Sequence, residues 1–191
     1  MGLLTMARDT VSDPRGGARR IMAIDLTLQE RWLALLLMAV VSTLLTHLSF
    51  ALAPVETQDF MGEFMASPLR TAFIQAIVLF AGTLAVYRFG QARGGTGSLA
   101  DTVSLMAWLQ FILLVAQVAQ VVAEMLLPPL AQLIGLVAVA LFFWLLTNFV
   151  AELHGFRSLG ATFVGVILGM MALAFLMALV LAPFMPAVEG V

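Results

Sequence analysis

The chain has 191 residues, of which 62% are hydrophobic and 10% are charged, whereas an ordinary soluble domain has roughly 45–50% and about 25%. These proportions exclude a soluble globular domain. The absence of cysteine excludes disulfides, thiolate metal sites and thiol nucleophiles. The formal net charge of −2 gives no overall field that attracts nucleic acid, so we expect no nucleic-acid partner.

Residues 1–31 precede the first long apolar stretch and are expected to form a basic cytoplasmic leader with a short amphipathic helix at the membrane interface. Within segment 13–30, Ser12 or Asp13 is placed to cap a helix and Pro14 suits its first position. The apolar residues that recur at helical spacing are Ile21, Ile24 and Leu28. Glycines near the start are expected to weaken its first turn.

The membrane spans follow from five stretches that contain no charged residue. A helix crosses the bilayer with about 20 apolar residues and sometimes with about 17, so each stretch is long enough to span. The predicted spans are about 32–53, 71–87, 102–126, 130–150 and 160–183. The sequence therefore predicts an all-α fold, a polytopic transmembrane bundle of five helices forming one membrane domain over 32–185, with a short outer tail at 186–191.

The arginines fix the expected orientation, because basic residues are retained on the cytoplasmic side of a membrane. All nine basic residues are arginine, and eight lie in the leader or in the loops between spans two and three and spans four and five. Arg70 alone lies on the opposite side. We therefore expect a cytoplasmic amino terminus and an outer carboxyl terminus. The arginines expected to contact anionic lipid headgroups are Arg15, Arg19, Arg20, Arg88 and Arg93. The alternative is a basic flank that only sets orientation.

The two outer connections have different patterns. Residues 54–70 lie between two prolines, and the apolar residues Phe60, Met61, Phe64 and Met65 predict a short amphipathic helix on the outer interface. Between spans three and four, Pro128-Pro129 predicts an extended, tight turn, since proline disfavours α geometry in the preceding residue.

Span three carries the most informative polar pattern. Four polar residues of this span lie on one helical face, within an arc of about 80°. They are Gln110, Gln117, Gln120 and Glu124. Unpaired polar groups are costly in hydrocarbon, so this face must meet other helices or water. We favour interhelical hydrogen bonds over a hydrated cleft. His47 of span one completes this candidate polar cluster, with Gln117 or Gln120 as the expected partner; a satisfied structural histidine is favoured over a functional one.

Two further patterns concern packing. Ala161, Gly165 and Gly169 form a ridge of small residues that predicts a close helix–helix contact, intramolecular in preference to a homodimer, which stays possible. The glycine turn at 94–97 leads to Ser98, the expected cap of span three.

The loop at 152–157 contains an acid, a histidine and an arginine but no nucleophile or metal set, so a turn is favoured. We expect no catalytic residue, metal or cofactor.

Four features together resemble a known family. They are the leader motif Asp13-Pro14-Arg15, the five spans, the loop Gly94-Gly95-Thr96-Gly97-Ser98 and the loop Leu153-His154-Gly155-Phe156. The chain resembles the bacterial branch of the YIP family, five-span proteins related to Golgi proteins that interact with Rab-type GTPases. The eukaryotic Asp-Leu-Tyr-Gly-Pro motif and long amino-terminal domain are absent, as is a proline often found in span three, so GTPase binding is not carried over.

The resemblance implies a multi-pass protein of the bacterial inner membrane with a role in membrane organisation. Two function classes remain open. A non-catalytic scaffold or accessory subunit, with the lipid bilayer and other membrane proteins as partners, predicts polar faces that are paired. A small transporter or channel predicts a hydrated path along the glutamine face. We favour the scaffold because no charged residue lies near the middle of a span.

Overall fold

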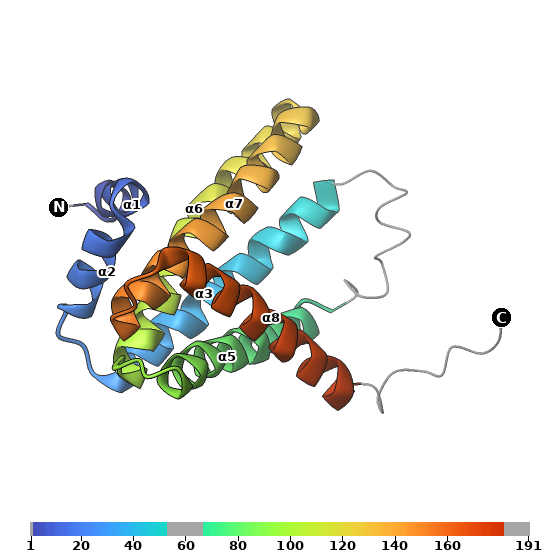
Figure 1. Ribbon diagram of the computed structural model, residues 1–191. Coiled ribbons are helices and arrows are strands. Elements are labelled where there is room, and N and C mark those ends of the chain that lie inside the picture. The colour runs from blue at the N-terminus through green and yellow to red at the C-terminus, as the bar shows by residue number, and fades with distance from the viewer. Residues whose placement is uncertain (1, 53–66, 182–191) are drawn as a thin grey trace.

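The computed structural model describes residues 2–52 and 67–181, and these residues form an all-helical fold (Figure 1). The helices are α1 (Leu3–Ser12), α2 (Pro14–Met22), α3 (Leu28–Leu52), α5 (Pro68–Ala92), α6 (Leu99–Leu126), α7 (Pro128–His154) and α8 (Leu159–Leu181). The last five are long and apolar enough to cross a membrane. The all-α fold with five candidate spans is thus confirmed. The outer helix predicted around Phe60 and Phe64 lies outside the described residues.

Helix α6 is the centre of the bundle, with α3 and α7 as its main packing partners. Only Leu127 separates α6 from α7, and its backbone is extended with φ −154° and ψ 85°. Pro128 then occupies the first turn of α7, where the missing proline N–H costs no hydrogen bond. The predicted tight turn at the two prolines is confirmed.

The buried core lies toward one end of the bundle. Along α6, residues 102–109 are all buried, and along α7 residues 145–151 are all buried. At the opposite ends of the same helices, Leu126 is 79% exposed and Leu136 is 67% exposed. Figure 1 shows the helices gathered at the end where α1 and α2 lie and separating toward the other end. We call the end that carries α1 and α2 the loop end, because loops 93–98 and 155–158 lie there. We call the opposite end the far end.

The amino-terminal segment forms two helices instead of the single helix predicted over 13–30. Asp13 caps α2 by accepting a hydrogen bond from the Gly16 N–H at 2.9 Å, and Pro14 is the first residue of α2, as predicted. However, α2 ends at Met22, so the predicted length is wrong. The reason is a second capping motif, in which Thr27 and Glu30 bond to each other's backbone N–H and begin α3.

Helices α1 and α2 are docked on the loop end of the bundle. The side-chain N–H of Trp108 donates to Thr10 Oγ1 at 3.2 Å, and that of Trp144 donates to the Val11 carbonyl at 3.4 Å. A Cβ on Gly17 would lie 2.5 Å from Thr10 Cγ2. Of the two glycines expected to weaken α2, Gly17 therefore permits the close approach of α1, and Gly16 leaves room for the capping carboxylate of Asp13.

Candidate functional site

The three short motifs behind the family resemblance converge at the loop end. Arg15 Nη2 donates to the Phe156 carbonyl at 3.4 Å, which joins the first motif to the third. A Cβ on Gly97 would lie 2.6 Å from Leu153 Cγ and 2.9 Å from the Leu153 carbonyl oxygen, so the second motif is pressed against the third. An ion pair between Arg19 Nη1 and Glu152 Oε1, 2.9 Å apart, adds to the same junction.

His154 sits in a cage at this junction. It is the last residue of α7 and 3% exposed, and its Nε2 lies 3.2 Å from the Val86 carbonyl oxygen of α5. A carbonyl can only accept, so Nε2 carries the hydrogen. A Cβ on Gly90 would overlap the ring, and one on Gly95 would lie 2.5 Å from Nδ1. These glycines therefore make room for the imidazole, and His154 is a packing element between α5 and α7.

The rest of the third motif forms a helix end, in agreement with the turn expected at 152–157. The ring of Phe156 stacks on that of His154 with 5.5 Å between the centroids. Gly155 has φ 73°, a left-handed conformation that glycine adopts without strain. The Phe156 N–H then returns to the Ala151 carbonyl at 2.8 Å, which closes α7.

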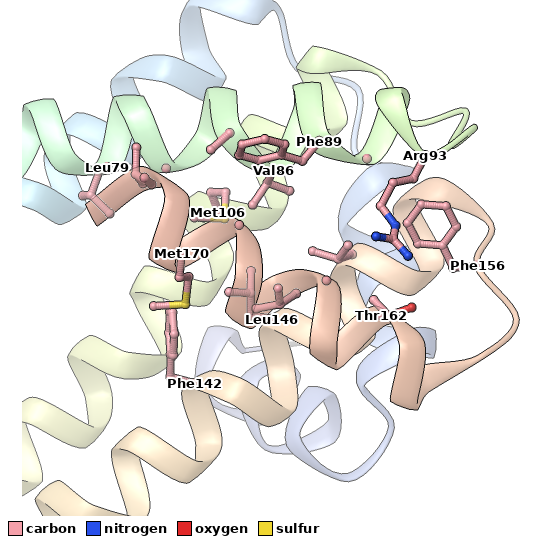
Figure 2. Close-up of a pocket in the computed structure, with 18 of the residues that line it drawn as sticks. Leu79, Val86, Phe89, Arg93, Met106, Phe142, Leu146, Phe156, Thr162 and Met170 are labelled. Atoms are coloured by element: carbon pink, nitrogen blue, oxygen red, sulfur yellow. The ribbon is translucent and has the colours of Figure 1, made fainter. Parts of the chain in front are cut away.

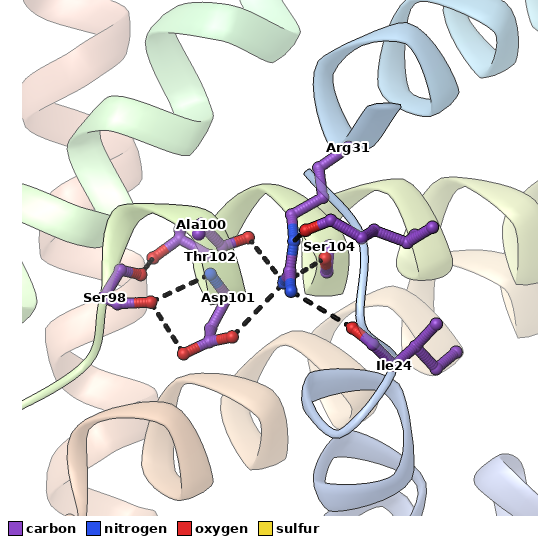
Figure 3. A network of polar contacts seen from close by, with 8 residues as sticks. Ile24, Arg31, Ser98, Ala100, Asp101, Thr102 and Ser104 are labelled. Atoms are coloured by element: carbon purple, nitrogen blue, oxygen red, sulfur yellow. Dashed lines mark hydrogen bonds and ion pairs between the residues drawn. The ribbon is translucent and has the colours of Figure 1, made fainter. Parts of the chain in front are cut away.

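Arg31 connects the start of α3 to the start of α6 (Figure 3). The residue is 8% exposed, and each side-chain nitrogen has an acceptor. Nη1 donates to Ser104 Oγ at 2.7 Å, to the Ala100 carbonyl at 3.2 Å and to Asp101 Oδ1 at 3.3 Å. The remaining donors reach the carbonyls of Leu26, at 3.0 Å, and Ile24, at 3.1 Å.

The start of α6 is also capped as the sequence predicted. Ser98 Oγ accepts from the Asp101 N–H at 3.0 Å, and the Ser98 hydroxyl donates to Asp101 Oδ2 at 2.6 Å. Asp101 thus serves both the cap and Arg31, as Figure 3 shows. The sequence analysis used Arg31 only to orient the protein. Two local features of the sequence could have indicated this contact. Arg31 lies directly before one predicted span, and Asp101 lies in the first turn of another.

Part of the predicted polar face of α6 bonds to α3. Gln117 Oε1 accepts from Ser42 Oγ at 2.9 Å, while Gln117 Nε2 donates to Thr46 Oγ1 at 3.0 Å and to the Ser42 carbonyl at 3.3 Å. Toward the far end, the Ser49 hydroxyl donates to Glu124. The signal for this seam is the stripe of small polar residues in the first span, which recurs every three or four positions and so lies on one helix face.

The other members of the predicted cluster are not brought together. Gln110 and Gln120 make no side-chain hydrogen bond with any described residue, and Gln120 lies beside Gly135 of α7. His47 Nε2 is buried without a hydrogen-bond partner within the described part of the chain. The predicted bond from His47 to Gln117 or Gln120 is not formed, and the amide of Gln117 is bonded to Ser42 and Thr46 instead.

A groove runs between α5 and α8, beginning at the loop end (Figure 2). It encloses about 910 Å³ between atoms, its open side included. Arg93 and Phe156 lie at one end of it, and Leu79 and Met170 lie toward the other. The remaining lining residues are apolar side chains and glycines of α5, α6, α7 and α8, apart from Thr162.

The small-residue ridge of α8 faces this groove in part. A Cβ on Gly165 would first meet the Arg93 guanidinium at 3.8 Å, and one on Gly169 would first meet the Phe89 ring at 3.5 Å. These are ordinary contact distances to side chains, whereas the sequence analysis expected close approach of a second backbone. Ala161 is exposed. The two glycines widen the groove between α5 and α8.

Comparison with known proteins identifies the family. The model of the Yip1 domain matches residues 8–180. The chain belongs to the Yip1 domain family. This confirms the resemblance to the YIP family, and with the five apolar helices it shows a membrane protein of that family. No curated protein and no solved structure matches the chain.

In this Yip1 domain, the arginines expected at anionic lipids fall into two groups. Arg15 and Arg19 bond to protein groups, the Phe156 carbonyl and Glu152. The exposed side chains of Arg20, Arg88 and Arg93 make no hydrogen bond or ion pair with any residue that the structure describes. Lipid contact by these arginines stays a prediction, and in the second group no side-chain donor is bonded to a described residue.

Proposed function

We propose that this Yip1 domain is a non-catalytic scaffold or accessory subunit of the bacterial inner membrane. The observation that carries the proposal is the pairing of the polar seam between α3 and α6. Both amide atoms of Gln117 are engaged by Ser42 and Thr46, and Glu124 accepts from Ser49. Side chains that bond neighbouring helices stabilise the bundle and are not free to coordinate a solute.

The shape of the bundle supports the same proposal. The loop end is held by Arg31, by the ion pair of Arg19 with Glu152 and by the His154 cage. The long helices expose apolar faces elsewhere, such as Leu136 and Leu176. A rigid base with apolar helix faces suits an accessory role, in which lipids and other membrane proteins cover those faces. Co-purification in mild detergent would identify such partners.

Reconstitution distinguishes the scaffold from the alternative, a small transporter or channel along the glutamine face. Vesicles containing the wild-type protein should show no ion or solute flux above empty vesicles. Gln117→Leu should lower the free energy of unfolding in detergent by about 0.6 kcal/mol and at most about 1.7 kcal/mol, the range of interhelical hydrogen bonds in membranes.

Gln110→Leu is the matched control, since Gln110 lies on the same helix and has no hydrogen bond with a described residue. It should leave the free energy of unfolding nearly unchanged. Flux through the wild-type protein that Gln117→Leu abolishes without loss of stability would overturn the scaffold proposal in favour of the transporter.

A further inference from the structure

The groove between α5 and α8 combines an apolar wall with one charge. Of the described residues that line it, Arg93 alone is charged. Thr162 contributes the other polar side chain, and its hydroxyl hydrogen is already donated to the Ser158 carbonyl at 2.8 Å. The groove therefore presents hydrocarbon along its length and an arginine at the loop end.

The guanidinium of Arg93 is available to a ligand. Arg93 directly follows Ala92, the last residue of α5, so its charge lies where a span ends. It makes no hydrogen bond or ion pair with any described side chain, and it lies over Gly165, where a Cβ would be 3.8 Å from Cζ. Figure 2 shows the guanidinium beside the groove. Five N–H donors in a planar fork suit the oxygens of a phosphate.

The dimensions of the groove suit an acyl chain. Its lining on α5 extends from Val78 to Arg93, a rise of roughly 22 Å at 1.5 Å per residue. Gly82, Gly165 and Gly169 widen it, and apart from the neighbouring backbone of α5 no described atom lies within 4 Å of the position of a Cβ on Gly82. A ligand with a long apolar tail and an anionic head matches both the length and the position of the charge.

We infer that this groove binds one anionic glycerophospholipid, with an acyl chain between α5 and α8 and its phosphate on Arg93. The isolated positive charge selects an anionic headgroup over a zwitterionic one, whose ammonium it would repel. The inference goes beyond the scaffold role and does not depend on it, since flux and lipid retention are measured separately.

Native mass spectrometry of the full chain tests the site. The protein is purified from detergent containing equal amounts of phosphatidylglycerol and phosphatidylcholine with the same acyl chains. The wild-type protein should retain one phosphatidylglycerol with a preference of about fivefold, the ratio expected for one arginine near a membrane surface. Arg93→Gln should reduce that preference to about one.

Arg88→Gln is the matched control, because it removes the same charge from an exposed residue of α5 that does not line the groove. It should keep the preference. An equal decrease in both variants would mean general attraction of anionic lipid to the surface and would overturn the site, as would equal retention of the two lipids by the wild-type protein.

Gly82→Leu tests the apolar part without relying on charge. The added side chain enters the groove where nothing lies within 4 Å of the Cβ position, and loss of a helical glycine favours folding. Retention of both lipids should fall while the melting temperature is maintained. Undiminished retention would overturn the proposal, and a dimer that only Gly82→Leu dissociates would assign the groove to a second copy of the chain.

Discussion

Arg31 shows how a charge is accommodated at the edge of the membrane domain. A buried arginine such as Arg31, 8% exposed as a residue, loses most of its hydration, and the loss is tolerable only when its donors are bound. Three of its acceptors are backbone carbonyls, and two are the side chains of Ser104 and Asp101. The residue thereby joins the linker before α3 to the first turn of α6.

We expect Arg31→Lys to destabilise the protein although the charge is kept. A lysine ammonium has three donors on a flexible stem and cannot reproduce the planar fork of arginine. The free energy of unfolding in detergent should fall by about 1–3 kcal/mol, the cost of leaving buried hydrogen-bond acceptors without a donor. Arg20→Lys is the control, since Arg20 is exposed, and should change stability by less than about 0.5 kcal/mol. Similar melting curves for the two variants would contradict the role given to Arg31.

At the scale of elements, Gly90 sets how closely α5 approaches the end of α7. Its Cα faces the His154 ring with no room for a Cβ, Gly95 also lies against the imidazole, and the Phe156 ring stacks on it. A side chain at position 90 would therefore force the imidazole or α5 to shift. Gly82, two turns earlier in the same helix, faces the open groove.

Replacement of these two glycines by alanine should have opposite effects. Gly90→Ala should lower the free energy of unfolding by about 1–3 kcal/mol, as overpacking does in other cores. Gly82→Ala should raise it by up to about 1 kcal/mol through helix propensity alone. Thermal unfolding in detergent measures both. The cost of Gly90→Ala should shrink in a His154→Ala background, and an unchanged cost there would show that the imidazole is not the obstacle.

The sequence predicted the elements better than the contacts between them. Charge-free stretches and caps such as Asp13 and Ser98 are local signals, so the helices and the turn at Pro128 could be predicted from the sequence. The pairing of Gln117 with Ser42 and Thr46 was not predicted, because a polar stripe on each of two helices does not specify which side chains will meet. The groove was also beyond prediction. The same glycine ridge that packs two backbones together in one bundle lines an opening in another, and only the position of α5 distinguishes the two.

Most of the charged residues that the structure describes lie at the same end as the buried core, whereas Arg70 and Glu124 lie toward the far end. Arg93 and Arg157 lie in the two loops that form this loop end, and the docked α2 adds Arg15, Arg19 and Arg20. Retention of basic residues in the cytoplasm would place this end inside the cell. The chain would then cross the membrane five times and end outside.

The absence of cysteine makes this orientation testable by single-cysteine labelling of the full chain. Thr96→Cys, in an exposed loop position, should react with a membrane-impermeant maleimide only after the cells are permeabilised. Val191→Cys should react in intact cells. Arg20→Cys is a second inner position and should behave like Thr96→Cys. Labelling of positions 96 and 191 from the same side would contradict the orientation and the odd number of crossings.

The docking of α1 and α2 has a consequence for biosynthesis. Arg15 bonds to Phe156, a residue 141 positions later in the chain, and α2 packs against α6 and α7. At translation rates of about 5–20 residues per second, the amino-terminal helices leave the ribosome roughly 7–28 s before this partner is made. During that interval the apolar face of α2 is uncovered and Arg19 lacks Glu152. The docking of α1 and α2 therefore has to wait until α6, α7 and the loop that follows α7 have been made.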